Sequence, residues 1–405
     1  MIEHKEHFHG SDLEKIEKVF GIKKEDIISF SANVNPLGIS EHLKKVLCNN
    51  IDIISSYPDR EYTALKAAIS SYANCASEKI VLANGATELI SLFVGLTSPK
   101  HALILGPSYS EYEHEVKKCG GVCEYFMLKS ENDFELNCDE LFKALGYVDT
   151  NSVESNSVVS TSTETNAPVD LLIICNPNNP TGTAIEASVM ENIISFCAIR
   201  GIFVMVDETY VEFCEDVNAI SCVPLTSKHN NLVVLRGTSK FFAAPGLRLG
   251  YAVLGSDEII ASMNEKINAW SINSIATLAG ETMFSDNDYI QKTRSLISEE
   301  RDKYYKLFSK SSRFKPYKPA ANFMLMEIVD DTDTSNSTVS SDDAIVCDNI
   351  SNNIELTSEI LFERCIRKGL MIRDCSTFAG LSNKFIRFCF MKPEDNARLA
   401  EMLLK

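Results

Sequence analysis

The stretch Leu232–Lys240 has the sequence LVVLRGTSK, in which four apolar residues precede an arginine, a glycine, two hydroxyl residues and a lysine. A short continuous apolar run bounded by polar residues is typical of a strand that is buried on both faces. Lys240 would then lie just beyond the end of such a strand, eight positions before Arg248. This position suits a lysine that binds a phosphate-bearing cofactor covalently, although most lysines are solvated surface residues.

The same pattern of an apolar run, a turn and a helical segment recurs along the chain. Repeated units of this kind predict an α/β fold with a large domain, in which helices flank a mostly parallel sheet. Ligands of such sheets bind beyond the carboxyl ends of the strands, where the polar residues that follow each run would gather. The other predicted strands are residues 79–83, 102–105, 171–175 and 202–206.

Residues 290–405 form a second, smaller α+β domain in this interpretation. A helical pattern covers residues 290–309, and strand-like runs cover residues 323–328 and 385–390. The large domain is predicted at residues 51–289, and residues 1–50 are expected to pack with the small domain. Two segments, 149–168 and 330–353, are rich in Ser, Thr and Asn and are predicted to be mobile surface insertions without a chemical role.

Composition narrows the classes of function. The chain has 405 residues, of which 45% are hydrophobic and 23% charged, as in globular proteins. Its net charge of -17 argues against nucleic acid or an anionic membrane as a partner. The polar start and the absence of a long apolar run predict a cytoplasmic protein. The 13 cysteines are scattered without zinc-ligand spacing, so we expect reduced thiols and no metal.

Three further segments carry polar residues at predicted strand ends. Asp207 follows an apolar run, where a buried carboxylate needs a partner; a protonated pyridine nitrogen would serve, with Tyr210 near the ring oxygen. The turn at residues 176–182 could direct the Asn179 amide at the same oxygen, and residues 84–88 open a helix that could receive a phosphate. Each segment has an ordinary alternative. Asp207 could cap the next helix with Tyr210 in the core, residues 176–182 could form an ordinary turn, and residues 84–88 could form an ordinary helix cap.

Six motifs in this order resemble the pyridoxal-phosphate enzymes of the aspartate aminotransferase superfamily, over nearly the whole chain apart from the two insertions. The resemblance implies pyridoxal 5'-phosphate as the cofactor. The nearest branches are the threonine-phosphate decarboxylases and the histidinol-phosphate aminotransferases. The motifs are NGATE (84–88), PSYSEY (107–112), NPNNPTG (176–182), DETY (207–210), SKFFAAPGLRLGY (239–251) and IRDCSTFAGLSNKFIRF (372–388).

Cofactor-binding roles follow from the resemblance position by position. Lys240 matches the lysine that binds the cofactor covalently, Asp207 the acid on the pyridine nitrogen, and Tyr210 and Asn179 the partners of the ring oxygen. Tyr109 matches the aromatic residue that stacks on the ring. The residues that match the phosphate cup are Gly85, Ala86, Thr87, Ser239 and Arg248.

One match implies a partner, and one position departs from the family. Tyr57 matches a tyrosine that reaches the cofactor phosphate of the other subunit, which implies a homodimer with shared active sites. Gly237 stands where the family often has Ser or Thr, three positions before the lysine. Thr238 or backbone amides are the expected replacements for that missing hydroxyl.

Substrate-binding roles fall on four residues. Arg387 lies between apolar neighbours and matches the arginine that binds the substrate's α-carboxylate, and Arg373 resembles a substrate-site arginine of the decarboxylase branch. An ion pair with Asp374 is the alternative for Arg373. Asn33 and His9 are candidates for the substrate's phosphate, because the N-terminal segments around them resemble the decarboxylase branch; a structural role is the alternative for His9.

These resemblances predict decarboxylation of an O-phospho-amino acid. The expected substrate is L-threonine O-3-phosphate and the product (R)-1-aminopropan-2-yl phosphate, as in cobalamin biosynthesis. Histidinol-phosphate aminotransferase, or another class I/II aminotransferase, is the alternative. A non-catalytic binding module on the same fold is a remote third reading, which the presence of Lys240, Asp207 and Arg387 disfavours.

Overall fold

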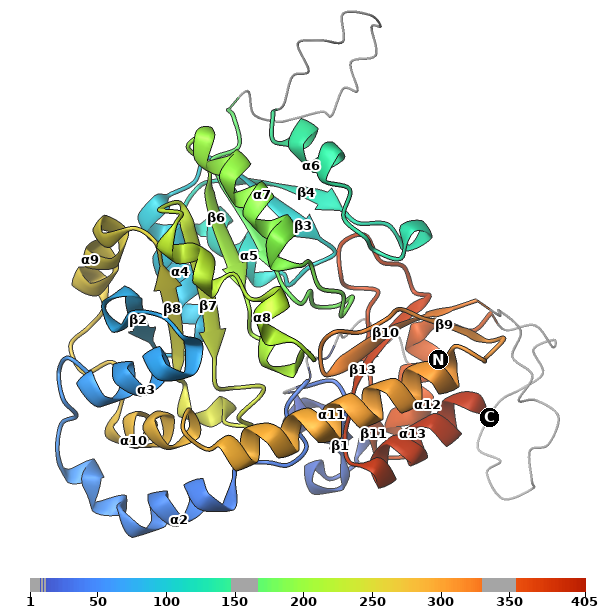
Figure 1. Cartoon of the computed structure of the whole chain (residues 1–405). Helices are drawn as coiled ribbons and strands as arrows, with labels where there is room; N and C mark the ends of the chain where they lie inside the picture. Colours follow the sequence, from blue (N-terminus) through green and yellow to red (C-terminus); the bar gives the residue numbers. More distant parts are fainter. Residues whose placement is uncertain (1–7, 9, 11, 147–166, 330–354) are drawn as a thin grey trace, which may run out of the picture. The chain divides into compact units, whose positions relative to one another are not determined.

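The computed structural model describes Phe8, Gly10 and residues 12–146, 167–329 and 355–405 (Figure 1). His9 lies outside the described residues, as do the predicted insertions apart from Ala167 and Pro168. The chain divides into two compact units: unit 1 comprises residues 1–36, 180–182 and 295–405, and unit 2 comprises residues 37–179 and 183–294. Residues 37–50, expected with the small domain, belong to unit 2, where α2 (Glu41–Asn49) packs with α10 (Ser274–Met283).

Unit 2 is built on a seven-stranded sheet of order β2-β8-β7-β6-β5-β3-β4 within the described residues. The strands β7, β6, β5, β3 and β4 are mutually parallel, whereas β8 runs antiparallel to both β2 and β7. The predicted mostly parallel sheet is therefore confirmed. The strands are β2 (Ile80–Ala83), β3 (His101–Gly106), β4 (Val122–Met127), β5 (Leu171–Cys175), β6 (Phe203–Asp207), β7 (Leu232–Gly237) and β8 (Gly250–Leu254).

Helices cover both faces of this sheet, which explains why its strands are continuous apolar runs (Figure 1). Alternate residues of one strand point to opposite faces, and both Ile173 and Ile174 of β5 are fully buried. Ile173 belongs to a core cluster that includes Phe93 of α4 and Val116 of α5. The further helices of unit 2 are α3 (Thr63–Ala73), α4 (Ala86–Thr97), α5 (Glu111–Lys118), α6 (Cys138–Ala144), α7 (Ala187–Ile199), α8 (Val217–Ile220) and α9 (Asp257–Lys266).

Unit 1 contains an antiparallel sheet of order β12-β13-β10-β9 and a short parallel pair, β1 with β11. The pair joins the N-terminal segment to the C-terminal part of the chain, and Phe8 stacks on Phe362 of α12 at 5.7 Å. Phe308 of α11 packs against Phe388 of β13, with ring centres 5.7 Å apart. The strands are β1 (Ile28–Ser29), β9 (Phe314–Pro316), β10 (Phe323–Ile328), β11 (Leu370–Met371), β12 (Arg373–Asp374) and β13 (Phe385–Cys389).

The helices of unit 1 complete an α+β arrangement, as expected. The division between the units falls within α11 (Asn287–Phe308), since residues 287–294 belong to unit 2. The other helices are α1 (Leu13–Phe20), α12 (Ser358–Ile366) and α13 (Pro393–Leu404). Among the described residues, none of the helices has both the length and the apolar character that a membrane crossing requires.

Candidate functional site

Three predicted site segments of unit 2 follow neighbouring parallel strands. Cys175, the last residue of β5, pairs with Asp207 at the end of β6, and Asp207 in turn pairs with Leu235 of β7. Lys240 follows β7 directly and is half-buried. The turn after β5, Asp207 and Lys240 therefore come from the carboxyl ends of three adjacent strands, where α/β sheets bind their ligands.

A second group of predicted residues meets at the start of α4. Gly250 of β8 pairs with both Ala83 of β2 and Gly237 of β7, so the loops after β2 and β7 and before β8 are neighbours. A Cβ atom on Gly85 would lie 2.6 Å from Nη2 of Arg248, and φ of Gly85 is +87°. Only glycine allows this approach without strain.

This group fits the phosphate of pyridoxal phosphate. The first N–H groups of a helix have no partner within the helix and attract anions, and Ala86 and Thr87 form the first turn of α4. Arg248 adds a positive charge, and its Nη2 donates a hydrogen bond to the Asn84 carbonyl at 3.3 Å. The Arg248 guanidinium occupies the space that a Cβ on Gly85 would need, so its charge lies directly at the start of α4.

Gly237 lacks the hydroxyl that the family often has at this position, and Thr238 does not supply it. The Thr238 hydroxyl is fully buried and donates to the Leu249 carbonyl at 3.1 Å, and its N–H bonds to the same carbonyl. Thr238 therefore has no proton left for a phosphate, contrary to the expectation from the sequence. A Cβ on Gly237 would lie 4.0 Å from the Ala86 nitrogen, so a side chain there would reach the helix start.

Asp207 is 5% exposed and has its carboxylate held by three donors. Oδ1 accepts hydrogen bonds from the N–H and the hydroxyl of Thr209, at 2.9 and 2.5 Å, and Oδ2 accepts one from the Tyr112 hydroxyl at 2.7 Å. These donors on both oxygens fix the plane of the carboxylate, which suits an ion pair with a protonated pyridine nitrogen. Sequence reasoning missed Tyr112; its only signal was its place three residues after Tyr109.

Tyr109 packs against Tyr112, the residue that donates to Asp207. The two rings meet edge-on, with centres 5.7 Å apart. Burial, followed by the charges of Glu111 and Asp207, raises the pKa of Tyr109 to about 12, whereas Arg248 lowers it. Because the charges of both Asp207 and Arg248 act on the Tyr109 hydroxyl, Tyr109 is well placed to stack on a ring that these two groups bind.

The turn after β5 is anchored to its surroundings at both ends. Asn178 donates to the Pro107 carbonyl at 2.9 Å, which ties this turn to the one that carries Tyr109. Asn176 bonds through its side chain to both the N–H and the carbonyl of Ile185, at 2.8 Å each. Asn179, the predicted partner of the ring oxygen, is half-buried in this turn, and Tyr210 is 5% exposed.

A buried charge network lies next to the strand ends that carry Asp207 and Lys240. Arg236 of β7 donates through Nε and Nη2 to Glu208 at 2.9 and 2.7 Å, and through Nη2 to Ser221 at 2.6 Å. Glu208 and Arg236 are 0% and 3% exposed. This ion pair joins β6 and β7 within four residues of Lys240, and sequence reasoning did not identify it.

Glu212, on the short helix Val211–Phe213, is a second carboxyl beside the same arginine and is 1% exposed. The pKa of Glu212 is raised to about 7, because burial, with a smaller contribution from Glu208, outweighs the lowering by Arg236 and Arg294. The pKa values of the buried Tyr72 and Tyr251 are also raised, partly by Glu212, so both hydroxyls stay neutral. One arginine is thus shared by two carboxyls, of which Glu212 holds the proton at acidic to neutral pH.

Replacing Glu212 with glutamine is expected to reduce the loss of folding stability that occurs as pH rises. The folded pKa lies above the ordinary value of 4.5, so the folded state keeps a proton that the unfolded chain releases. Folding stability then falls as pH rises from about 4.5 through about 7, by roughly 3 kcal/mol at 1.36 kcal/mol per unit. The glutamine side chain stays neutral, so thermal unfolding of the cofactor-free variant at pH 5.5 and 8 should show a smaller difference. Glu258→Gln, at an exposed position, serves as control; an unchanged difference for Glu212→Gln would contradict the prediction.

Unit 1 brings the two predicted arginines side by side. Arg373 of β12 and Arg387 of β13 are directly paired, are 7% and 4% exposed, and lie 5.4 and 6.0 Å from the centre of the Phe378 ring. Arg373 donates to the Phe8 carbonyl and, at 3.0 Å, to the Thr377 hydroxyl. Burial and then the adjacent Arg387 lower the pKa of Arg373. Two buried guanidinium groups on directly paired residues favour binding of an anion.

The remaining candidates of unit 1 surround these arginines in part. Arg387 donates to the Ser31 carbonyl at 2.9 Å, and the buried Ser31 hydroxyl lacks a hydrogen-bond partner among the described residues. Asn33 is 1% exposed, has φ of +56°, and its carbonyl accepts from Asn322 at 3.0 Å. The Asp374 carboxylate accepts from Ser358 and Ser376, at 2.7 and 3.0 Å. These serine contacts weaken the alternative in which Asp374 serves mainly as an ion partner of Arg373.

Tyr57 is exposed, as are the predicted cofactor residues Thr87 and Arg248. The Tyr57 side chain is 80% exposed and packs against Trp270, with ring centres 4.9 Å apart. Arg60 lies over the same Trp270 ring at 5.7 Å. The resemblance assigns Tyr57 to a neighbouring subunit's cofactor, and its exposure leaves it accessible to a second chain.

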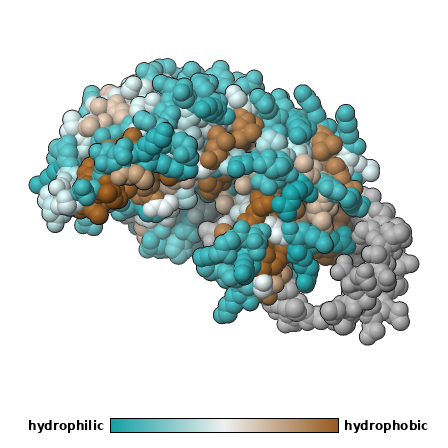
Figure 2. All heavy atoms as spheres, turned by 90° about the horizontal axis from the view of Figure 1, so that it is seen from below, coloured by the Kyte–Doolittle hydropathy of each residue, from teal (hydrophilic) through white to brown (hydrophobic). Residues whose placement is uncertain are grey.

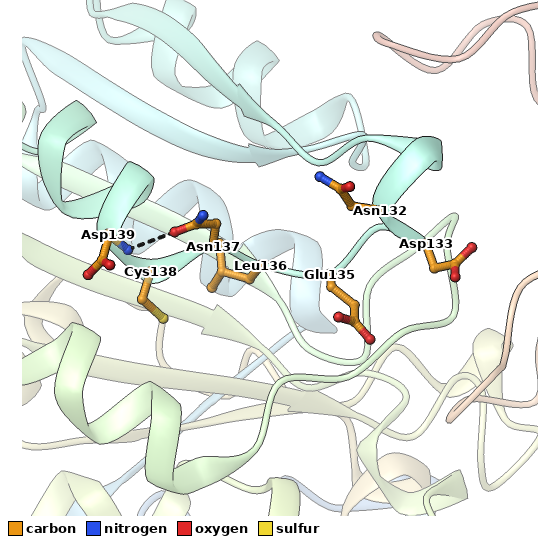
Figure 3. A pocket seen from close by; sticks show the side chains of 7 residues that line it. All are labelled: Asn132, Asp133, Glu135, Leu136, Asn137, Cys138 and Asp139. Atoms are coloured by element: carbon orange, nitrogen blue, oxygen red, sulfur yellow. Dashed lines mark hydrogen bonds between the residues drawn. The ribbon is translucent and has the colours of Figure 1, made fainter.

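A polar hollow of about 590 Å³ lies in unit 2, lined by residues of the segment 132–139 (Figure 3). Asn137 uses its side chain there to accept from the N–H of Asp139 at the start of α6. None of the predicted site residues lines the hollow, and its side chains lack the cation that a phosphate or carboxylate ligand would need. The strand ends described above are the better candidate site.

The comparisons with known proteins show the family of the chain. The family model of class I and II aminotransferases matches residues 25–403, and the chain belongs to this family. Its members are pyridoxal-phosphate enzymes, and a histidinol-phosphate aminotransferase from Sinorhizobium meliloti was solved with pyridoxal-5'-phosphate. That structure matches with a TM-score of 0.75 and 19% identity, covering 96% of this chain and 92% of the other.

Two further relatives are more similar in sequence. A protein from Caldanaerobacter subterraneus subsp. tengcongensis, whose name assigns it threonine-phosphate decarboxylase activity provisionally, is 32% identical over 92% of this chain and 88% of its own length. The histidinol-phosphate aminotransferase from Clostridium acetobutylicum has a TM-score of 0.76 and 27% identity, covering 92% of this chain and 97% of that one. Both branches named from the sequence are thus represented among the relatives.

Proposed function

We propose that this pyridoxal-phosphate enzyme decarboxylates an O-phospho-amino acid, L-threonine O-3-phosphate, to (R)-1-aminopropan-2-yl phosphate. The observation that carries the proposal is the pair of buried arginines, Arg373 and Arg387, on adjacent strands. Two guanidinium groups match a substrate that bears both a carboxylate and a phosphate. The 32% identical relative supports the same choice by its name.

The chain's own residues have distinct tasks in this proposal. Bound pyridoxal phosphate supplies an electron sink for one bond to the substrate's Cα. The Asp207 carboxylate would accept the pyridine N–H of the cofactor, and the start of α4 with Arg248 would hold its phosphate. Lys240 would hold the cofactor covalently until the substrate's amino group takes its place, and its Nζ would then supply the proton that replaces the departing CO2 on Cα.

Orientation of the substrate decides which bond breaks. The bond held perpendicular to the cofactor ring is cleaved fastest, so the group that binds the carboxylate chooses between loss of CO2 and loss of a proton. We assign the carboxylate to Arg387 and the phosphate to Arg373, with Asn33 and His9 as further phosphate ligands. The N-terminal resemblance to the decarboxylase branch supports the latter two.

Histidinol-phosphate aminotransferase is the second candidate, supported by the 27% identity to the Clostridium enzyme. A single assay separates the two. Purified protein is incubated with threonine phosphate, with serine phosphate, and with histidinol phosphate plus 2-oxoglutarate. Release of CO2 from threonine phosphate without an oxo acid is the expected result. Glutamate formed from histidinol phosphate, without CO2 from either phospho-amino acid, would replace the proposal with the aminotransferase.

The discrimination between threonine and serine phosphate is expected to be modest. One methyl group in an apolar pocket is worth roughly 1 to 3 kcal/mol, or about 10- to 200-fold in kcat/KM. We therefore expect slower but measurable CO2 release from serine phosphate.

We infer in addition that the enzyme is a homodimer with shared active sites. Tyr57 supports this, since it is 80% exposed in one chain but matches a cofactor ligand of the partner. Ile51 and Ile54, on the short helix Ile51–Ser55 that precedes it, are 51% and 65% exposed. Exposed large apolar side chains near one another mark interaction surfaces. The face drawn in Figure 2 carries several patches of hydrophobic side chains among hydrophilic ones.

A further inference from the structure

The Tyr112 hydroxyl donates a hydrogen bond to the Asp207 carboxylate, and a hydrogen bond to a charged acceptor is stronger than one between neutral groups. Tyr112 lies on α5, is 1% exposed, and donates from its hydroxyl to Oδ2 of Asp207 at 2.7 Å. Its ring belongs to the core cluster of unit 2, beside Val116. Phenylalanine would fill this apolar space equally well, so the hydroxyl requires a separate reason.

The Tyr112 hydroxyl is a donor over the whole physiological range. Burial, then the charge of Asp207 and that of Cys175, raise its pKa well above the ordinary value of 10. The proton therefore stays on the phenol. The hydroxyl remains available as a donor to Oδ2 of Asp207 throughout this range.

Tyr112 and Thr209 hold the two oxygens of the carboxylate from different elements. Thr209 follows β6 directly and bonds only to Oδ1, whereas Tyr112 reaches Oδ2 from α5. With one oxygen held, a carboxylate can still turn about its Cβ–Cγ bond; with both held, its plane is fixed. The direction of its remaining lone pairs is then set before a ligand arrives.

We propose that Tyr112 is a positioning residue that orients Asp207 toward the pyridine nitrogen of the cofactor and shares the charge of its carboxylate with that nitrogen. The inference rests on the proposed role of Asp207 in the preceding section. It has two consequences that can be measured separately. Loss of the hydroxyl frees the carboxylate plane and weakens cofactor binding, and it leaves the whole carboxylate charge to the pyridine N–H, whose proton is drawn toward oxygen.

The test compares Tyr112→Phe with the wild-type full-length enzyme. The cofactor dissociation constant, from absorbance titration of the cofactor-free protein, is expected to rise roughly tenfold, the effect of one hydrogen bond to a charged group. The ¹⁵N resonance of the pyridine nitrogen in labelled pyridoxal phosphate is expected to move toward that of the unprotonated ring. A purely structural role for Tyr112 would change thermal stability and leave this resonance in place.

Tyr125→Phe is the matched control. Tyr125 is a tyrosine of the same unit whose hydroxyl also donates to a carboxylate, that of Glu113 at 3.0 Å. Its removal should change neither the dissociation constant nor the ¹⁵N resonance. Equal effects of Tyr112→Phe and Tyr125→Phe on both readouts would overturn the proposal.

A second variant covers the case in which Tyr112→Phe folds poorly. Site-specific incorporation of 3-fluorotyrosine at position 112 keeps the ring and the hydroxyl but makes the phenol a stronger donor. Cofactor affinity should then match that of the wild type, because the hydroxyl still holds Oδ2 of Asp207, and a loss as large as that expected for Tyr112→Phe would overturn the proposal.

Asp207→Asn separates this inference from the proposed function. If Asp207→Asn leaves cofactor affinity unchanged, Asp207 does not face the pyridine nitrogen and the assigned cofactor site is wrong. If Asp207→Asn weakens binding and Tyr112→Phe changes neither readout, only the role of Tyr112 is wrong.

Discussion

Lys240→Ala is expected to abolish turnover and to eliminate covalent attachment of the cofactor. Lys240 is half-buried directly after β7, next to the strand that ends in Asp207. Its loss removes both the covalent bond to the cofactor and the proton donor to Cα. A positioned proton donor alone contributes roughly 10²- to 10⁴-fold, so the rate should fall by at least about 10³-fold.

Borohydride reduction followed by mass spectrometry measures the attachment independently of turnover. The wild-type chain should gain the mass of the reduced cofactor on the peptide that contains Lys240, and its visible absorbance should be lost. The Lys240→Ala chain should gain nothing. Lys228→Ala is the control, since Lys228 forms a surface ion pair with Glu191 and should behave as the wild type. Cofactor fixed to the Lys240→Ala chain would disprove the assignment.

Arg387→Lys is expected to lower kcat/KM for threonine phosphate by roughly 10²- to 10³-fold. Loss of one partner from a buried, hydrogen-bonded charge pair costs about 2 to 5 kcal/mol. Lysine keeps the charge but loses the two parallel donors that fix the plane of a carboxylate. Because this plane selects the bond to be broken, kcat should fall along with the apparent affinity for the substrate.

Cofactor absorbance serves as the internal check for this variant, because the assigned cofactor residues all belong to unit 2 and Arg387 to unit 1. The absorbance should stay at the wild-type level in Arg387→Lys. Arg313→Lys is a control in the same unit, where Arg313 donates to the Leu403 carbonyl at 3.3 Å. A kcat/KM within about threefold of the wild type for Arg387→Lys would exclude Arg387 as the carboxylate ligand, since a bidentate contact is worth more than that.

Strands and their terminal residues were predictable because they depend on local pattern. Continuous apolar runs are buried on both faces of a parallel sheet, so β5 was predicted with its observed bounds and β6 within one residue. The helix predicted at residues 290–309 is observed as Asn287–Phe308. The α/β class followed from the alternation of these patterns. The motif resemblance then supplied the roles of Lys240 and Asp207, which no pattern of apolar residues contains.

Contacts between segments distant in sequence were not predictable. The antiparallel insertion of β8 between β2 and β7 brings Arg248 against Gly85, far away in the chain, and only the strand order shows this. The hydrogen bond from Tyr112 to Asp207 joins residues 95 positions apart in the sequence, and the ion pair of Arg236 with Glu208 joins residues 28 positions apart. Of the two replacements expected for the missing hydroxyl at position 237, Thr238 donates its hydroxyl proton to the Leu249 carbonyl, and the backbone amides stay a prediction.

The sequence by itself determined the class of fold and the family, and it predicted the residues that carry chemistry, because burial patterns and motif spacing are local properties of the chain. Tertiary structure alone decided which of these residues meet. Strand order set the neighbours at the sheet edge, and register placed Arg373 beside Arg387. Packing of α5 brought the Tyr112 hydroxyl into contact with the Asp207 carboxylate. The physical reason is that hydrogen bonds and ion pairs act over a few ångströms in space, whereas the spacing of residues along the chain does not specify which distant strands become neighbours.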